Sequence, residues 1–142
     1  MKTRLAFSAL VIAGLCAMTG AVPNSAAQSS ADAGAVQLIT VSAERYRFDP
    51  SEIRVKLGTT VRLKITASDH AHGFKINLTP EGEKGGEPGL VFASPQECVK
   101  IEQGQTTTVE FVAKKAGTYA FHCCVVCGWH HHAMKGQLIV EP

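Results

Sequence analysis

Short segments in which apolar and polar side chains alternate are the feature that most restricts the fold of this chain. In residues 61–66, Val, Leu and Ile alternate with Arg, Lys and Thr. Successive side chains of an extended chain point to opposite faces, so this period of two predicts a strand with one buried face. Comparable segments occupy residues 36–41, 52–57, 106–112, 118–123 and 137–140. The sequence therefore predicts several short strands and no long helix.

Turn-forming residues separate these segments. They are Asp49-Pro50, Leu57-Gly58, residues 115–117 and Lys135-Gly136. Residues 79–95 interrupt the pattern with several Gly and Pro, and we expect them to form a surface loop or an irregular crossover. Short strands at this spacing predict an all-β fold, a β-sandwich or barrel, in a 142-residue chain that is long enough for one domain.

The N-terminus has the pattern of an export signal. Lys2 and Arg4 precede an apolar run at residues 5–18, and small residues that suit cleavage follow. The run is shorter than the roughly 20 residues that a membrane-spanning helix needs. We therefore expect residues 1–27 to be a signal peptide and residues 28–34 a flexible lead-in. The folded domain would then be part of an exported, periplasmic protein with no stable membrane span.

The net charge bears on the kind of partner. The chain has 14 Lys and Arg residues against 12 Asp and Glu residues. Lys2 and Arg4 lie in the predicted signal peptide, so the mature chain has equal numbers of basic and acidic residues. Proteins that bind nucleic acids need a basic face. We therefore expect no nucleic-acid partner.

The His, Cys and Met residues cluster in two places. Two His lie in residues 69–74, and four His, three Cys and one Met lie in residues 121–134. Met1 and Met18 belong to the predicted signal peptide, so Met134 is the only Met of the mature chain, and this favours a ligand over a packing role. Thiolate and thioether sulfur mixed with imidazole select copper over magnesium, calcium or manganese. The sequence therefore predicts a copper cofactor.

The spacing of the second cluster suits a single metal centre. It reads Cys123-x3-Cys127-x3-His131-x2-Met134 and lies between two predicted strands. A loop of this kind can present thiolate, imidazole and thioether groups to one point. We expect His72 to reach the same point from a distant loop, provided that both loops share one end of the sandwich.

The ligand loop is also the specific part of a resemblance to a known family that runs over nearly the whole mature chain. The chain resembles the cupredoxins, and specifically the binuclear copper (CuA) domain of cytochrome c oxidase subunit II and nitrous oxide reductase. The family's C-x3-C-x3-H-x2-M pattern is matched position by position, and Asp69-x-x-His72-Gly73-Phe74 matches upstream. The resemblance implies a cupredoxin-like Greek-key β-sandwich over residues 35–142.

The resemblance also implies a set of copper ligands. Its members are two bridging thiolates, one imidazole for each of two coppers, a weak thioether ligand and a backbone carbonyl. In this chain they are, in that order, Cys123 and Cys127, His72 and His131, Met134, and the carbonyl of Val125. Two thiolates shared between two coppers delocalise one electron, so little has to move during electron transfer. We expect Trp129 and residues 125–126 to provide an apolar surround that tunes the potential.

Further possible donors lie beside this set. Cys124 is an extra thiol inside the loop, His130 and His132 flank the matched imidazole, and His70 lies just upstream of the other predicted His ligand. These four residues are possible additional metal ligands or supports of the ligands. Cys98 either pairs with Cys124 or is free.

Four other interpretations stay open at this point. The four Cys of the mature chain could form two disulfides. Cys124-Val-Val-Cys127 could be a thiol–disulfide exchange motif, and Cys and His ligands could hold zinc. A mononuclear blue copper site would use His72, Cys127, one His of residues 130–132 and Met134.

The sequence predicts a carrier rather than an enzyme. We find no acid–base pair or second ligand cluster, so we expect no catalytic residues, and any oxidase activity would require partner subunits. The first hypothesis is an electron-transfer protein whose redox partner is a c-type cytochrome or another cupredoxin. The second hypothesis is a copper chaperone or buffer that uses the additional donors to take up and release copper.

Overall fold

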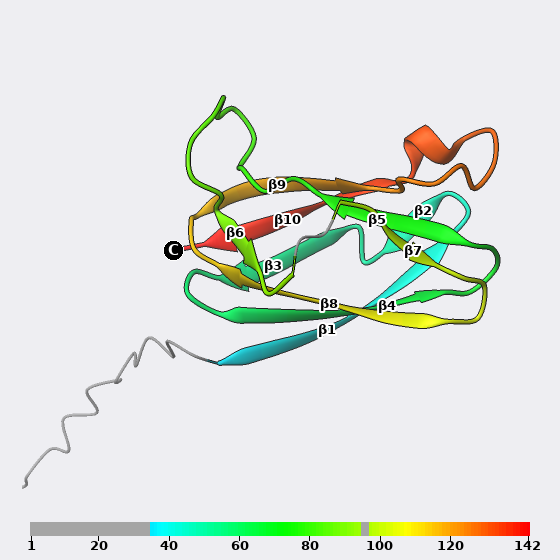
Figure 1. Ribbon diagram of the computed structural model, residues 1–142, viewed down its shortest axis with the longest axis horizontal. Helices are drawn as coiled ribbons and strands as arrows, with labels where there is room; N and C mark the ends of the chain where they lie inside the picture. Colours follow the sequence, from blue (N-terminus) through cyan, green and yellow to red (C-terminus); the bar gives the residue numbers. More distant parts are fainter. Residues whose placement is uncertain (1–34, 95–96) are drawn as a thin grey trace, which may run out of the picture. The chain divides into compact units, whose positions relative to one another are not determined.

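A computed structural model describes residues 35–94 and 97–142, and these residues form strands and one short 3-10 helix (Figure 1). In chain order the elements are β1 (Val36–Glu44), β2 (Arg47–Asp49), β3 (Glu52–Lys56), β4 (Thr60–Ala67), β5 (His72–Ile76), β6 (Leu90–Phe92), β7 (Val99–Ile101), β8 (Thr106–Ala113), β9 (Gly117–His122), η1 (His131–Ala133) and β10 (Lys135–Glu141). The predicted signal peptide and lead-in lie outside the described residues. Those two assignments stay predictions.

The strands form two five-stranded sheets. The first has the order β2-β1-β4-β8-β6 and the second has the order β3-β10-β9-β5-β7. Strands β1 and β4 pair in parallel, as do β3 and β10, and the other pairs are antiparallel. The two sheets form the layers of a sandwich in Figure 1, with β1, β4 and β8 in one layer and β5, β9 and β10 in the other. The predicted all-β sandwich is confirmed.

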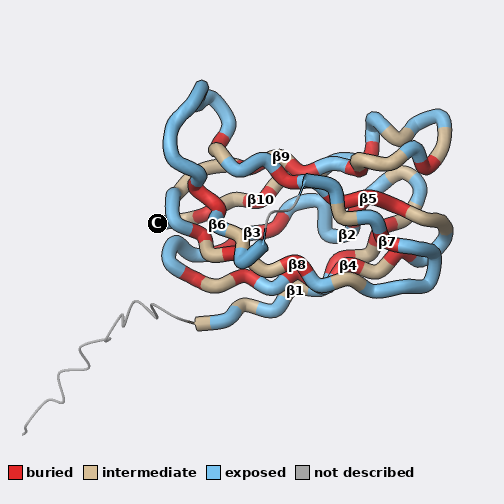
Figure 2. The backbone as a smooth tube through the Cα atoms, viewed as in Figure 1, coloured by how far each residue is buried: buried red, intermediate tan, exposed pale blue. Residues whose placement is uncertain are grey.

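The alternating segments place their apolar side chains between the sheets. Val61, Leu63 and Ile65 of β4 are completely buried, whereas Arg62 and Lys64 are exposed. Figure 2 shows the same alternation of buried and exposed positions along the strands of both sheets. Burial of a side chain of this size contributes about 1.5–3 kcal/mol, so the period of two fixes which face of each strand lies inside.

An aromatic cluster occupies the part of the core beneath the predicted metal ligands. Phe48 of β2, Phe74 of β5 and Phe121 of β9 are buried, with ring centroids 5.3–5.9 Å apart. Phe74 lies two residues after His72, and Phe121 lies two residues before Cys123. Residues two apart on a strand share one face, so His72 and Cys123 continue the inward-facing rows that begin with these rings.

The structure differs from the sequence-based prediction in two places. Residues 79–95 are not entirely loop, because β6 lies within them and pairs with β8, burying Leu90. Lys135-Gly136 is not a turn but the start of β10, paired with the end of β9. A Cβ on Gly136 would collide with the ring of Phe121 and the carbonyl oxygen of Ser51, so this glycine permits close packing rather than chain reversal.

Within residues 35–94 and 97–142, we find no helix with the length and apolar character that crossing a membrane requires.

Candidate metal centre

The predicted ligands come from two neighbouring strands and the connection between β9 and β10. His72 is the first residue of β5, and Cys123 directly follows β9, which pairs with β5. The connection runs from Cys123 to Met134 and is closed by the backbone N–H of Cys123, which donates to the carbonyl of Met134 at 2.9 Å. His72 therefore lies on a strand and not, as predicted, on a loop.

The sulfur atoms of the predicted centre lie close together in the protein interior. The Cys123 and Cys127 side chains are buried free thiols with their Sγ atoms 3.6 Å apart. The Cys127 Sγ lies 3.9 Å from the Sδ of Met134, which has no exposed surface. One donor atom each from His72, Cys123 and Cys127 falls within a group whose members are all within 4.8 Å of one another. The structure thus brings together four of the predicted ligands.

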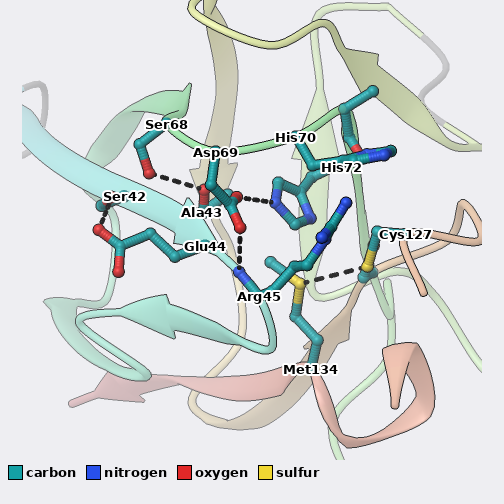
Figure 3. A network of polar contacts seen from close by, with 12 residues as sticks. Ser42, Ala43, Glu44, Arg45, Ser68, Asp69, His70, His72, Cys127 and Met134 are labelled. Carbon is teal, nitrogen blue, oxygen red and sulfur yellow. Dashed lines mark hydrogen bonds and ion pairs between the residues drawn. The ribbon is translucent and has the colours of Figure 1, made fainter. Parts of the chain in front are cut away.

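His72 is oriented by a carboxylate. Its ring is completely buried, and its Nε2 lies 2.8 Å from Oδ1 of Asp69, whose other oxygen accepts a 3.1 Å hydrogen bond from the backbone N–H of Arg45 (Figure 3). The Nδ1 atom of His72 is buried and has no hydrogen-bond partner among the described residues. An imidazole that donates one N–H to a carboxylate presents the other nitrogen as an acceptor, which is the arrangement of a metal-binding His.

Asp69 is held in the ionised form that this arrangement needs. Partial burial opposes its ionisation, but the hydrogen bonds from His72 and from the Arg45 backbone outweigh that effect and hold the pKa of Asp69 below its usual value. A charged acceptor favours the tautomer of His72 that carries its proton on Nε2. The unpartnered Nδ1 is then free to bind a metal.

The carbonyl that the resemblance implies is also near the thiols. The Cys123 thiol donates a 3.3 Å hydrogen bond to the carbonyl oxygen of Val125, and the Gly73 N–H donates to the Cys123 Sγ at 3.4 Å. N–H donors to a ligand sulfur stabilise its thiolate form and influence the redox potential of a bound copper. The Val125 oxygen therefore lies next to the Cys123 sulfur, and its role as a copper ligand stays a prediction.

Arg45 adds a positive charge near the thiols. Burial, followed by the neighbouring Cys123, raises the pKa of the Cys127 thiol to about 11, and the charge of Arg45 opposes this shift. Figure 3 shows the Arg45 side chain extending from the turn after β1 towards His72 and Cys127. Its guanidinium forms no ion pair among the described residues. Arg45 is not predicted from the sequence, because an exposed Arg in a turn carries no pattern that marks it.

His131 is placed differently from the other predicted ligands. It begins the 3-10 helix η1, and its donor atoms lie outside the group formed by His72, Cys123 and Cys127. Its Nδ1 is nevertheless buried without a hydrogen-bond partner, and its ring lies 3.8 Å from that of His132. His131 therefore has a buried nitrogen without a hydrogen-bond partner, but it does not belong to the group of donor atoms.

The additional His donors are at the surface. His130 and His132 are exposed, and the ring of His130 packs edge-on against Tyr46 with centroids 5.4 Å apart. His70 is half-buried, with its Nδ1 3.1 Å from the carbonyl oxygen of Ala71. Within the described residues, none of the three belongs to a group of donor atoms that could hold a metal.

The remaining two cysteines pair with each other. Cys98 and Cys124 form a disulfide with their Cα atoms 5.9 Å apart, which answers the open question about Cys98. The interpretation that the four cysteines form two disulfides is wrong, because Cys123 and Cys127 are free thiols. The exchange-motif interpretation also loses its basis, since it needs Cys124 to pair with Cys127.

Two residues predicted to surround the centre lie at the surface instead. The side chains of Trp129 and Val126 are 96% and 79% exposed, so they do not exclude water from the thiols. Only Val125 of this group packs against the core. Residues 123–134 form a connection with one 3-10 turn, and the path of this connection leaves Trp129 and Val126 facing outwards.

The donor set fits copper. It consists of two buried thiols, an imidazole nitrogen without a partner, and a buried thioether. A thioether is a poor zinc ligand, whereas thiolate, imidazole and thioether together are typical of copper sites. These residues form a copper site.

The match to known proteins agrees with this fold and site. Residues 9–140 match the cupredoxin-like domain family, and the chain therefore belongs to the cupredoxins. Cytochrome c oxidase subunit 2 of Thermus thermophilus is 28% identical over 103 residues, which cover 72% of this chain and 64% of the relative. Nitrous-oxide reductase of Stutzerimonas stutzeri is 29% identical over 99 residues, 67% of this chain and 13% of that protein. The chain thus matches less than two thirds of the length of either relative.

Solved structures share the fold at lower sequence identity. The periplasmic domain of cytochrome oxidase subunit II from Bradyrhizobium japonicum has a TM-score of 0.57 and 16% identity, covering 74% of this chain and 83% of that one. Auracyanin A of Chloroflexus aurantiacus, a "blue" copper protein, has a TM-score of 0.54 and 24% identity, covering 75% of this chain and all of that one. The predicted resemblance to the copper domain of oxidase subunit II is confirmed.

Proposed function

We propose that this protein is an electron carrier with a binuclear copper centre. Its ligands would be the thiolates of Cys123 and Cys127, the imidazoles of His72 and His131, and two weaker donors. The weaker donors would be the thioether of Met134 and the carbonyl of Val125. When bound, the copper pair accepts and gives up one electron. No residue is assigned a catalytic role.

The observation that carries this proposal is the pair of buried free thiols. Their sulfur atoms are 3.6 Å apart, beside the unpartnered Nδ1 of His72. A mononuclear blue copper site uses a single thiolate, so it leaves either Cys123 or Cys127 without a role. Two thiolates that face the same space can be shared between two metal ions.

The chain's own residues would keep the centre rigid during electron transfer. Strands β5 and β9 fix His72 and Cys123, and Asp69 fixes the ring orientation of His72. Met134 is fixed through its carbonyl, which accepts from the Cys123 N–H, and through complete burial of its side chain. Ligands that do not move between redox states make a small reorganisation energy possible, which is what an electron carrier requires.

Metal counting together with visible and EPR spectra tests the proposal. The purified full chain is loaded with copper, and copper is measured per chain. We expect two coppers per chain, a purple colour and a seven-line EPR pattern. One copper with an intense blue band and a four-line pattern would instead assign a mononuclear site like that of a blue copper protein.

A copper chaperone or buffer is the second candidate function. The observation that favours it is the position of His130 and His132, which are exposed on the same loop as His131. Surface imidazoles offer bound copper a route for exchange. A chelator competition separates the two functions: copper held by a carrier survives an excess of chelator, whereas copper held for delivery is lost within the assay.

The compartment and the redox partner belong to the same proposal. The Cys98–Cys124 disulfide supports an oxidising compartment, in agreement with the predicted export to the periplasm. Exposed Trp129 and Val126 lie on the ligand loop and would let a c-type cytochrome or another cupredoxin approach the centre. Fractionation of the producing cells tests the location, and stopped-flow mixing with reduced cytochrome c tests the partner class.

A further inference from the structure

We propose that Cys98 selects which thiols are available to copper. By holding Cys124 in a disulfide, it withholds that sulfur both from the metal and from Cys127. Cys123 and Cys127 then remain as the free thiols of the ligand loop. This inference rests on the proposed copper function, but its main test needs no metal.

The position of the bridge in the fold is the first support. Strand β5 lies between β9 and β7 in the second sheet, Cys124 follows β9, and Cys98 precedes β7. The disulfide therefore reaches across the strand that carries His72. It joins two segments on either side of β5 and holds the Cys124 sulfur in a bond to Cys98, whereas Cys123 and Cys127 stay free.

The packing of the bridge is the second support. A Cβ on Gly73 would lie 2.6 Å from the Sγ of Cys124 and 2.9 Å from the backbone nitrogen of Val125. Glycine at this position therefore makes room for the Cys124 sulfur on the backbone of β5. The Gly73 N–H is at the same time directed at the Sγ of Cys123. One residue of β5 thus accommodates the bridged sulfur and contacts the free one.

The spacing of the cysteines shows why Cys124 has to be kept away from the other thiols of the loop. Cys123 and Cys124 are adjacent, and Cys124 and Cys127 have the two-residue spacing at which disulfides form readily. If Cys98 were absent, the thiols of Cys124 and Cys127 could react with glutathione disulfide. The product would be a Cys124–Cys127 disulfide, with two molecules of reduced glutathione released. That reaction would remove one of the two thiolates that the centre requires.

A matched pair of variants distinguishes two roles of Cys98: keeping Cys124 away from the other thiols, and stabilising the fold through a covalent link. The single variant Cys98→Ser frees Cys124, whereas the double variant Cys98→Ser/Cys124→Ser removes both sulfurs of the bridge. Both variants lose the same covalent link between the segment before β7 and the ligand loop. If the disulfide only stabilises the fold, both variants should change the free thiols of Cys123 and Cys127 equally. If Cys98 keeps Cys124 away from the other thiols, the single variant should lose free Cys127, and the double variant should keep it.

The main experiment maps thiols in the metal-free full-length proteins. Each protein is equilibrated in a glutathione redox buffer at a ratio where the wild type keeps its Cys98–Cys124 bridge. It is then quenched in acid, alkylated and mapped by mass spectrometry, and far-UV circular dichroism checks the fold. We expect Cys123 and Cys127 to be alkylated in the wild type and in the double variant, and a Cys124–Cys127 disulfide to form in the single variant.

Anaerobic titration with copper provides the second measurement. In the single variant we expect the free Cys124 to join the metal and change the thiolate-to-copper absorption, while the double variant keeps the wild-type spectrum. The inference is overturned if the single variant keeps all three loop thiols in the redox buffer, or if both variants lose them equally. If the wild type does not bind copper in this titration, the proposed function is wrong. The mapping of free thiols in the metal-free proteins would still decide the role of Cys98.

Discussion

The two imidazoles proposed as copper ligands differ in how firmly the fold holds and orients them before metal is bound. His72 begins a strand, is completely buried, and is oriented by Asp69. His131 begins a 3-10 helix in the connection between β9 and β10, and its donor atoms lie outside the group formed by His72 and the two thiols. Each ring nevertheless has a buried Nδ1 without a hydrogen-bond partner. The sheet therefore places His72 with the two thiols, whereas His131 lies outside this group.

This difference follows from the backbone interactions of each residue, which are sheet pairing for His72 and a local turn for His131. The backbone of His72 is held by pairing with β7, and its side chain continues the inward row of Phe74. The turn that contains His131 is closed by local backbone hydrogen bonds, such as that from the Ala133 N–H to the carbonyl of His130. Local contacts of this kind open at lower free energy than a sheet does.

Removal of each imidazole should have unequal effects on copper affinity. We expect His72→Ala to lower the affinity by roughly a hundredfold or more, because a preformed ligand is lost. We expect a smaller loss for His131→Ala, since ordering its turn offsets part of what the ligand contributes. Competition titration with a copper chelator measures both losses of affinity. Equal losses in the two variants would show that the fold prepares both imidazoles alike.

The role of Asp69 in preparing His72 can be tested without removing a ligand. Asp69→Ala leaves the imidazole without its carboxylate, and we expect copper affinity to fall roughly 10–100-fold. Asp69→Asn keeps an acceptor of the same shape, so it should recover part of this loss. Nitrogen couplings to His72 in the EPR spectrum should change in parallel. An Asp69→Ala variant with wild-type affinity would mean that packing alone orients the ring.

The charge of Arg45 should tune the reduction potential with little effect on binding. A positive charge near the centre favours the reduced state, because the incoming electron is attracted to it. We expect Arg45→Ala to lower the potential by roughly tens of millivolts, with solvent screening limiting the effect. Arg47→Ala is the control, since the Arg47 guanidinium is exposed and pairs with Glu44 at 2.8 Å. If a redox titration shows equal shifts of the reduction potential in Arg45→Ala and Arg47→Ala, the charge of Arg45 has no special effect on the centre.

The outer face of the ligand loop should contribute least to the centre itself. Trp129 is 96% exposed, so Trp129→Ala should change the free energy of unfolding by no more than about 0.5 kcal/mol and leave the copper spectrum as it is. Electron exchange with cytochrome c should nevertheless slow, because the contact surface is lost. Chemical denaturation and stopped-flow mixing measure the two effects. A changed copper spectrum would show that Trp129 contacts the centre in solution.

Much of the fold was predictable, and the exceptions have identifiable causes. Strand β4 follows directly from the alternation in residues 61–66, because local periodicity determines which face is buried. Strand β6 was missed because its three residues are too short for a period and lie among Gly and Pro. Gly136 was mistaken for a turn residue, since a sequence cannot show that Phe121 packs against it.

The donor residues of the candidate site could be predicted from residue type and spacing. The neighbouring groups that orient and charge them could not. The C-x3-C-x3-H-x2-M pattern is local, so it identifies Cys123, Cys127 and Met134 without any knowledge of the fold. The contribution of Asp69 and Arg45 depends on a turn after β1 that approaches the start of β5, and no local pattern encodes that approach. The exposure of Trp129 likewise depends on the path of the loop.

The sequence by itself determined the period-two strands, the soft donor types and the spacing of the ligand loop, because each of these depends on neighbours along the chain. Only the tertiary structure decided that Cys98 pairs with Cys124, that His72 begins a buried strand, and that His131 stays outside the group of donors. These features join segments that are far apart in the sequence. The pairing order of the strands sets such distances, and composition, period and spacing do not contain that order.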